Sequence, residues 1–382
     1  MRSIKTKGFS LILAGGMLLA LAGCNMSAPS TVGNIGGVEI PSGLYLLMQY
    51  NAYNTAASKA TLPEGKKTSD VSAVLKAECT GTIGDEEVTA TGAEYIQKLT
   101  DRSVDYYAAV EKTFAELGGE LDADTLESVT TNADSLWESN GKLYEANGIG
   151  RSTVENYLLN AQKAKKILEL TYGENGTTPV TESEYKSYIA DSCYYIESVQ
   201  LPLINYTSYT AATEEQKAAI EEIAEACRKD LSEKTQGESA AASQVYTAAM
   251  TYAPQAMQAM GGTMESSQAV YYGASQLFTP STLSGYANSE DGTNKLTDPL
   301  DAAQPGEWVT IDLDSSILVA RRLDPLSTGA SVSDLVKSYD LLTAMKSSDM
   351  QNEMYAAGAA LEHNLDASAI KTYAASKIKK NV

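Results

Sequence analysis

Histidine is almost absent from this sequence, and its scarcity limits the chemistry that the chain can perform. The 382 residues contain one His, His363, so a Ser-His-Asp triad has one possible base and a multi-His metal site is impossible. The four cysteines, at positions 24, 79, 193 and 227, form no C-x-x-C pair, which argues against a cysteine-built zinc site. We therefore expect neither a metal nor a cofactor.

Other common signals are missing as well. No G-x-S-x-G, P-loop or G-x-G-x-x-G motif occurs. Positive charge is scarce, with 29 Lys and Arg against 49 Asp and Glu, and the resulting net charge of -20 repels nucleic acid. Phe and Trp number only 3 and 2, whereas Tyr numbers 23, so the aromatic side chains suit wet surfaces as well as cores. A hydrophobic content of 43% excludes wholesale disorder.

The first residues read as a targeting segment. Three basic residues precede an apolar run over 9–22, which is too short for a comfortable bilayer span, and the run ends in Leu21-Ala22-Gly23-Cys24. This order predicts a lipoprotein signal peptide over 1–23, lipidation of Cys24 and a tether over 24–33; a plain signal or an anchor helix are the alternatives. After cleavage three cysteines remain, an odd number that implies no complete disulfide framework.

Residues 34–192 are expected to be mainly helical. Apolar residues recur at spacings of three and four from Ile96 to Leu117, which predicts an amphipathic helix that ends at Gly118-Gly119. Further helices are expected over about 42–57 and 124–140. The patterns S-x-x-E at Ser152 and T-x-x-E at Thr181 predict capping boxes that open two more helices.

The pattern changes over residues 193–326. The stretch from Cys193 to Leu203 reads as a strand, and a capping box at Thr213 opens a helix that buries Cys227. A hairpin is expected around Asp314-Ser315. Residues 327–382 return to helices, which include His363, and their apolar faces must be buried somewhere. The economical solution packs them on the N-terminal helices, so that the middle unit is an insertion in one helical lobe.

This order of segments resembles the extracytoplasmic foldases of the PrsA and SurA type. NIGGVEIPSGLYLLMQY is similar to their opening turn and helix, and GIGRSTVENYLLNAQKAKKIL with VTESEYKSYIADS to the helices before their isomerase module. SVQLPL and LTDPLDAAQPGEWVTIDLDSSILVARRL resemble the first strand and the end of a parvulin module. The resemblance implies a mostly helical α+β fold, with a discontinuous helical chaperone lobe that carries an inserted parvulin-like α/β module.

The resemblance also implies where an active site would lie, and the sequence departs from the family there. Parvulin modules carry two His; the first falls on Gln200 and the second near Ser316 or Ile317. The glycine pair falls on Gly261-Gly262, but Thr263 follows where an acidic residue is expected. Prolyl isomerisation crosses a barrier of about 20 kcal/mol and needs only a pocket that stabilises the twisted bond, so the departures predict weak or lost activity.

Two sets of side chains are candidates for holding unfolded clients. Met250, Met257, Met260 and Met264 have the spacing of one helix face, which suits either a core or an adaptable apolar surface. Tyr185, Tyr188, Tyr194 and Tyr195 suit a similar cradle or ordinary packing. From these sets Tyr185, Tyr188, Tyr194, Met257 and Met260 are the predicted client-binding residues.

The sequence thus predicts a chaperone or foldase for unfolded or nascent secreted proteins, anchored through Cys24 to the outer face of a bacterial cytoplasmic membrane. The alternative is a solute-binding lipoprotein of an uptake system, and a third option is a structural envelope protein that only docks partners. Solute-binding proteins usually show repeated βαβ units in two lobes, whereas this chain has capped helices and one strand-rich insert, which favours the chaperone.

Overall fold

The structure is a computed structural model that describes residues 29–206, 208–235, 237, 239–288 and 291–380. The predicted signal peptide and Cys24 lie outside the described residues. Within the described part of the chain, every helix is too short or too polar to cross a bilayer.

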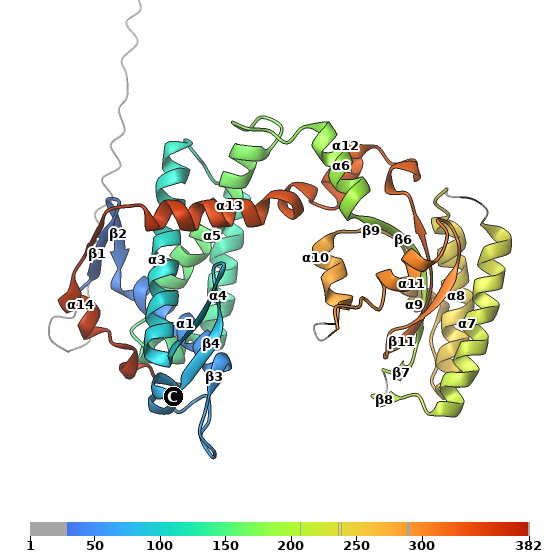
Figure 1. Cartoon of the computed structure of the whole chain (residues 1–382), viewed down its shortest axis with the longest axis horizontal. Coiled ribbons are helices and arrows are strands. Elements are labelled where there is room, and N and C mark those ends of the chain that lie inside the picture. Colours follow the sequence, from blue (N-terminus) through green and yellow to red (C-terminus); the bar gives the residue numbers. More distant parts are fainter. Residues whose placement is uncertain (1–28, 207, 236, 238, 289–290, 381–382) are drawn as a thin grey trace, which may run out of the picture.

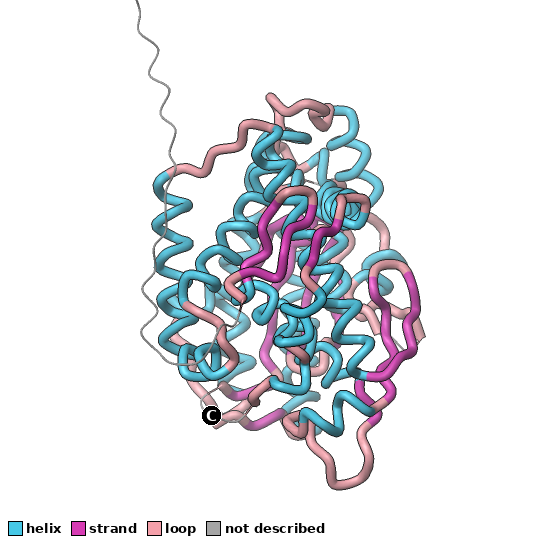
Figure 2. Tube along the Cα trace, turned by 90° about the vertical axis from the view of Figure 1, so that its left-hand side faces the viewer, coloured by secondary structure: helices cyan, strands magenta, loops and turns pink. Residues whose placement is uncertain are grey.

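The described residues form two lobes, joined along one side by α6 (Glu182–Ser192), α12 (Val332–Ser338) and one end of α13 (Leu341–Ala359) (Figure 1). One lobe is helical and combines the N-terminal and C-terminal parts of the chain. The other is an α/β module built from the middle of the chain. Helices dominate and the sheets are small and antiparallel, so the predicted mostly helical α+β fold with a discontinuous lobe is confirmed (Figure 2).

Five long helices make the helical lobe. Helix α3 lies against α1, α5 and α13, and α4 packs on α5. The amphipathic pattern from Ile96 is confirmed, because α3 buries Ile96, Tyr107, Val110 and Phe114. The five helices are α1 (Ser42–Lys59), α3 (Gly92–Glu116), α4 (Ala123–Ala146), α5 (Arg151–Tyr172) and α13.

A short helix and a small sheet lie between α1 and α3. The sheet order is β3-β4-β5, and β4 and β5 form a hairpin that places the buried Cys79 opposite Ala90. This hairpin contacts α1 and α3. The elements are β3 (Ala60–Thr61), α2 (Val71–Lys76), β4 (Glu78–Ile83) and β5 (Glu86–Thr91).

A second small sheet in the helical lobe pairs a strand from the N-terminal part of the chain with a strand from the C-terminal part. The strands β1 (Thr31–Ile35), β2 (Val38–Pro41) and β12 (His363–Leu365) lie in the order β12-β1-β2, and α14 (Ala367–Thr372) follows. The prediction that His363 lies in a helix is therefore wrong. His363 pairs with Ile35, and its ring contacts Asp105 on α3 at 2.7 Å, because three residues after α13 extend to complete this sheet.

Two glycines allow N-terminal and C-terminal elements of the helical lobe to approach each other closely. A Cβ atom on Gly33 would lie 2.3 Å from the carbonyl oxygen of Asn364, and Gly33 has a φ of +118°. A Cβ atom on Gly358 would lie 2.2 Å from the carbonyl oxygen of Asp105, where α13 crosses α3. Any larger side chain at these positions would push the C-terminal elements off the N-terminal ones.

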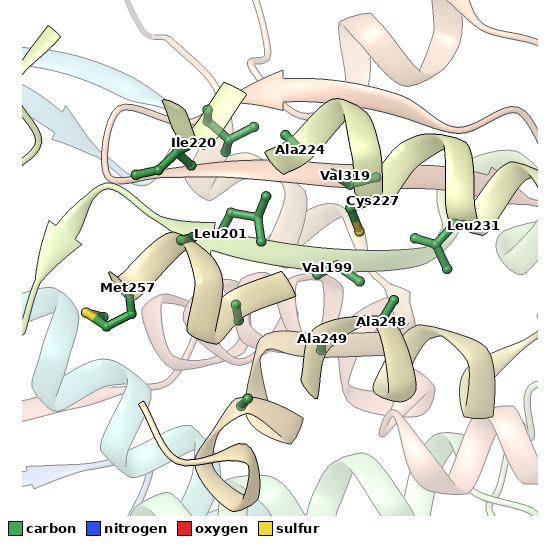
Figure 3. Close-up of a cluster of buried hydrophobic side chains, with 14 of the residues drawn as sticks. Val199, Leu201, Ile220, Ala224, Cys227, Leu231, Ala248, Ala249, Met257 and Val319 are labelled. Carbon is green, nitrogen blue, oxygen red and sulfur yellow. The ribbon is translucent and has the colours of Figure 1, made fainter. Parts of the chain in front are cut away.

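The inserted module is a four-stranded antiparallel sheet in the order β10-β11-β6-β9. Helices α7 (Glu214–Lys234) and α8 (Ala242–Ala259) cover one face over a core that includes Val199, Leu201, Cys227 and Val319 (Figure 3). The burial of Cys227 on the inward face of its helix is as predicted. The strands are β6 (Tyr194–Pro202), β9 (Gly273–Phe278), β10 (Val309–Asp312) and β11 (Ser316–Leu323).

Short elements complete the module. The predicted hairpin is confirmed, since β10 and β11 pair around a turn in which Asp314 has a φ of 63°. Helices α10 and α11 cover the second face of the sheet, and α10 lies on the side of the helical lobe (Figure 1). The remaining short elements are β7 (Ile204–Asn205), β8 (Thr210–Ala211), α9 (Ser266–Ala269), α10 (Pro280–Leu283), α11 (Thr297–Ala302) and the 3₁₀ turns Val270–Tyr272, Ser284–Tyr286, Pro325–Ser327 and Ala375–Lys377.

The capping predictions had mixed outcomes. Complete capping boxes open α6 at Thr181 and α7 at Thr213, as predicted, and another opens α3 at Thr91. The box predicted at Ser152 is wrong, because α5 begins at Arg151 and its N-cap is Gly150, two residues before Ser152. Glu155 instead forms an ion pair with Arg151 at 2.7 Å, one helical turn before it.

Candidate functional site: a hollow on the second face of the module sheet

Gln200 lies on the face of β6 that is turned away from α7 and α8. Successive side chains of a strand point to opposite faces, and the neighbours Val199 and Leu201 are both buried in the core beneath the two helices. In the sheet register Gln200 is directly opposite Leu318 of β11. Gln200 therefore belongs to the second face, which carries α10 and is turned toward the helical lobe (Figure 1).

A hollow of about 690 Å³ surrounds Gln200 on this face. Leu313, Leu318 and Tyr286 give it apolar surface. Lys295 and Asp314 form an ion pair of 2.5 Å at its rim. The lining consists of Gln200, Gly285, Tyr286, Ala287, Asn288, Lys295, Leu313, Asp314, Ser315, Ser316 and Leu318.

The strand register corrects one predicted site residue. Ser316 is on the same face as Gln200 and lines the hollow, although its side chain is almost fully buried. Ile317 points to the other face, is 4% exposed and packs in the core under α7 and α8. Ile317 is therefore excluded from the hollow, and the residue that faces Gln200 across the strands is Leu318.

The hollow offers polar groups and one ion pair. Its lining contains no His and no Cys. Burial raises the pKa of Cys193 to about 11 and that of Cys227 to about 12, so both thiols stay protonated and inert. Among the described residues no group of three or more His, Cys, Asp or Glu is arranged to hold a metal ion. The charged groups that line this hollow are Lys295 and Asp314, which are paired with each other.

A buried ion pair, not recognised from the sequence, stands on the opposite face of the same strands. Arg321 and Glu197 are both completely buried, and the guanidinium donates two hydrogen bonds to one carboxylate oxygen at 2.6 and 2.9 Å. The other oxygen accepts hydrogen bonds from Ser275 at 2.8 Å and from the backbone N–H of Ala241 at 2.6 Å. The charges are thus neutralised and hydrogen-bonded, as burial demands.

The same arginine fastens the loop between α7 and α8 to the sheet. It donates to the carbonyl oxygens of Gly237 and Ser239, and it lies 5.0 Å from the centre of the Trp308 ring. The indole N–H of Trp308 in turn donates to Thr235 at 2.7 Å. A charged residue inside the apolar strand SILVARRL was the available sequence signal. The network links β6 and β11, the two strands on which Gln200 and Leu318 lie.

Two of the predicted client-binding residues are unsuited to that role. Met257 and Met260 are each 5% exposed and pack in the module core, as Figure 3 shows for Met257. Helix α8 also ends at Ala259, so the expected continuous face through Met264 does not exist. Met250 is more accessible, at 39% exposed. The methionine spacing therefore marks mainly core packing.

The predicted tyrosines lie in two places, at the junction of the lobes and on the second face of the module sheet. Tyr185 and Tyr188 are half-buried and pack on a cluster that includes Ile189, Leu335 and Leu341, and burial raises the pKa of both phenols. Tyr194 lies on the same sheet face as Gln200 and donates to Asp301 at 2.9 Å. Tyr194 thus packs in a different cluster from Tyr185 and Tyr188.

Tyr185 lines a second hollow, of about 660 Å³, between the start of α6 and α12. Apolar lining comes from Val180, Val332, Val336 and Leu342, next to the phenol of Tyr185. This hollow differs from the one around Gln200 in its greater share of apolar side chains. The full lining is Gly173, Glu174, Pro179, Val180, Thr181, Glu182, Tyr185, Ser331, Val332, Ser333, Val336, Lys337 and Leu342.

The chain matches no family model and no curated protein. Among solved structures it is similar to the foldase protein PrsA from Streptococcus pneumoniae, with 11% identity and a TM-score of 0.37 over 78% of this chain and 98% of that one. PrsA from Bacillus subtilis is 12% identical, with a TM-score of 0.29 over 76% of this chain and 95% of that chain. The peptidylprolyl isomerase PrsA from Bacillus anthracis is 10% identical, with a TM-score of 0.26 over 69% and 98%. PrsA foldases, which the sequence resembles, are thus also among the solved structures to which the chain is similar.

Proposed function

We propose that this protein is a membrane-anchored extracytoplasmic chaperone or foldase, which holds unfolded or nascent secreted proteins and has weak or no prolyl isomerase activity. The single observation that carries the proposal is the hollow around Gln200. Its volume lies in the range of ligand-binding pockets, and its mainly polar lining includes the apolar side chains of Leu313 and Leu318 but neither His of a parvulin site. Such a hollow is suited to holding a chain segment rather than to transforming it.

The arrangement of the lobes supports the same role. The sheet face with the Gln200 hollow is turned toward the helical lobe, and the hollow beside Tyr185 lies at the junction (Figure 1). A client that lies between the lobes would meet the phenols of Tyr185 and Tyr194, which supply apolar surface together with a hydrogen-bonding group. Tyr188 packs at the same junction and is proposed as a supporting residue.

Weak or absent isomerase activity follows from the groups in the hollow. A Gln side chain donates a hydrogen bond through its amide but cannot take up a proton as an imidazole does. Leu318, directly opposite Gln200, offers neither. We therefore expect little acceleration of X-Pro isomerisation in a tetrapeptide substrate.

The test compares two activities of one protein, the chain from residue 25 onward, which contains every residue that the structure describes. We expect it to suppress aggregation of an unfolded reporter protein while leaving the isomerisation rate of an X-Pro tetrapeptide almost unchanged. Gln200→Ala should leave holding nearly intact, because holding depends on apolar surface. A parvulin that contains both His residues is the positive control for isomerisation.

Two outcomes would contradict the proposal. If the chain fails to suppress aggregation at any molar ratio, it is not a holdase. If it isomerises the tetrapeptide as fast as the control parvulin, and Gln200→Ala abolishes the activity, the protein is an active isomerase whose site includes Gln200.

The membrane anchor is proposed on the sequence Leu21-Ala22-Gly23-Cys24. A lipidated Cys24 would place the protein at the outer face of the cytoplasmic membrane. We expect Cys24→Ala to release the protein from the membrane fraction or to leave its signal uncleaved. Normal processing with unchanged membrane attachment would exclude Cys24 as the lipid site.

The solute-binding alternative has less support. The four sheets of the described chain are antiparallel throughout, whereas repeated βαβ units would give parallel strands. A screen for thermal stabilisation by small solutes separates the two functions. A shift of several degrees with one solute, together with failure to hold unfolded proteins, would favour uptake.

A further inference from the structure

The segment 374–380 lies in a groove of the helical lobe, close to α1 and the end of α4. Figure 1 shows the chain returning to this end of the lobe after α14. Ile378 is 9% exposed and belongs to the same buried cluster as Leu47 and Tyr50 of α1. A short segment that follows the last helix is thus anchored by one aliphatic side chain in a core made by the N-terminal helices.

The backbone of the segment is held by a single side-chain amide. Asn147 donates from Nδ2 to the carbonyl oxygen of Lys379 at 2.9 Å, and its Oδ1 accepts the backbone N–H of the same residue at 2.8 Å. Both bonds go to main-chain groups that every residue except Pro possesses. This contact recognises an extended chain without regard to the side chain at that position.

The next residue enters a cage of aromatic rings. The ammonium group of Lys380 donates to the hydroxyl of Tyr50 at 2.8 Å and to Oδ1 of Asn54 at 2.6 Å. It also lies 4.5 Å from the ring centre of Tyr50 and 5.6 Å from that of Tyr53. The cage therefore combines neutral acceptors with cation–π contacts, which suits a lysine side chain.

The segment leaves part of this groove unfilled. A hollow of about 490 Å³ remains between Leu46, Gly148, Tyr373 and the segment. Gln49 also lines it, is 3% exposed, and its Oε1 accepts no hydrogen bond from any described residue. A buried acceptor without a donor costs free energy.

The charges favour an exchangeable basic occupant. Residues 371–380 contain four Lys and no acidic residue, whereas the chain as a whole carries a net charge of -20. An acidic protein attracts basic segments and speeds their arrival.

We propose that this groove is a peptide-binding site, occupied in cis by segment 374–380, and that an extended client segment with an aliphatic residue two positions before a lysine displaces it. The recognition elements are the Ile378 pocket, the Asn147 amide and the Tyr50–Tyr53 cage. The client part of this inference rests on the chaperone function proposed above. The groove is separate from the hollow around Gln200, which belongs to the other lobe.

The test uses a fluorescent peptide with the sequence of residues 374–382 and the chain from residue 25 onward. In Ile378→Asp the chain's own segment loses its anchor, and we expect this variant to bind the peptide about 10- to 100-fold more tightly than the parent chain. The reason is that the covalent segment competes at an effective concentration in the millimolar range. Ser376→Asp is the matched control, because it adds the same charge at an exposed position and should leave peptide affinity unchanged.

The recognition elements are tested in the Ile378→Asp background. Adding Asn147→Ala, or replacing the isoleucine or the second lysine of the peptide's Ile-Lys-Lys run, should weaken binding at least about tenfold. Circular dichroism and Trp137 fluorescence check that each variant is folded. If Ile378→Asp is unfolded, Lys380→Ala takes its place, because it loosens the segment from the cage without a change in the core.

The outcomes separate this inference from the proposed function. If a folded release variant does not bind the peptide, the groove proposal is overturned, and the aggregation assay still decides whether the protein is a chaperone. If the peptide binds but an unfolded reporter does not displace it, the client part fails. Concentration-dependent dimers of the parent chain would show exchange of the segment between copies, and would also overturn the client assignment.

Discussion

The two lobes solve the problem of building a core in different ways. The module is continuous in sequence, and its sheet packs on α7 and α8 with mostly aliphatic and small side chains. The core of the helical lobe contains residues from the N-terminal and the C-terminal parts of the chain. Met350 and Met354 of α13, for example, pack with Val110 and Phe114 of α3. The stability of the module therefore depends on contacts within one continuous segment, whereas the core of the helical lobe is complete only when the C-terminal elements pack on the N-terminal helices.

The polar groups follow the same division. The module buries a complete Arg321–Glu197 pair. The ion pairs of the helical lobe that the structure describes are at least partly exposed, as for Lys163 and Glu111. A buried pair costs much if broken, while exposed pairs contribute little. Each lobe contains one of the two Trp residues, Trp137 and Trp308, so unfolding of the lobes can be followed separately.

The largest effect is expected from removing the C-terminal part of the helical lobe. A chain that ends at Pro325 lacks α13, β12 and α14 and leaves the apolar face of α3 exposed. We expect the cooperative unfolding transition of the helical lobe to disappear and aggregation to increase. The measurement is urea unfolding followed by Trp137 fluorescence in a Trp308→Phe background. An unchanged transition would show that the helical lobe is stable without its C-terminal part.

The next effect concerns the module alone. Arg321→Met leaves Glu197 buried without its partner, and we expect a loss of about 3–5 kcal/mol in the free energy of unfolding. Urea unfolding in a Trp137→Phe background, with Trp308 as the probe, measures it. The matched control is Arg322→Met, which breaks a partly exposed pair with Asp301 and should cost less than about 1 kcal/mol. Adding Glu197→Gln to Arg321→Met should restore part of the loss; a further decrease would contradict the assignment of the cost to the unpaired carboxylate.

A smaller effect is expected where α13 crosses α3. Gly358→Ala places a methyl group against the carbonyl of Asp105 and should destabilise the helical lobe by about 1–3 kcal/mol, without a change in the module transition. Gly285→Ala is the control, because its added methyl meets open space and should shift stability by no more than about 0.5 kcal/mol. If both substitutions changed stability equally, the close approach of α13 to α3 would not be the cause of the destabilisation.

The smallest effect is a pH dependence in the helical lobe. Burial, and then the nearby Asp105, raise the pKa of Asp101, against the lowering effects of a hydrogen bond from Gln97 and of His363. When folding raises the pKa of a carboxyl group, the group's contribution to the stability of the folded state is greatest below the pKa of the unfolded state. This contribution is lost as the pH rises through the pKa of the folded state, because the buried group then becomes charged. We therefore expect Asp101→Asn to stabilise the lobe at neutral pH and to lose this advantage in acid. Urea unfolding at pH 7 and pH 4 measures it, and destabilisation at pH 7 would reverse the sign of the argument.

Local patterns in the sequence predicted much of the secondary structure correctly. The capping boxes at Thr181 and Thr213 involve residues three apart. In the helix that buries Ile96 and Phe114, the apolar residues recur about once per turn. Such features need no distant partner, because the hydrogen bonds and the apolar face lie within one helix. The predominance of helices in the chain followed from them.

The site depended on contacts between residues far apart in the chain. Whether Ile317 or Leu318 faces Gln200 is decided by the register of two strands more than a hundred residues apart, and a shift of one residue reverses every side chain. Burial of Met257 in the module core and the partner of Arg321 likewise depend on which elements pack together. The sequence by itself determined the helices, the strands and the loss of the expected histidines. Only the tertiary structure decided which side chains share a face, because pairing and packing join residues that no local pattern connects.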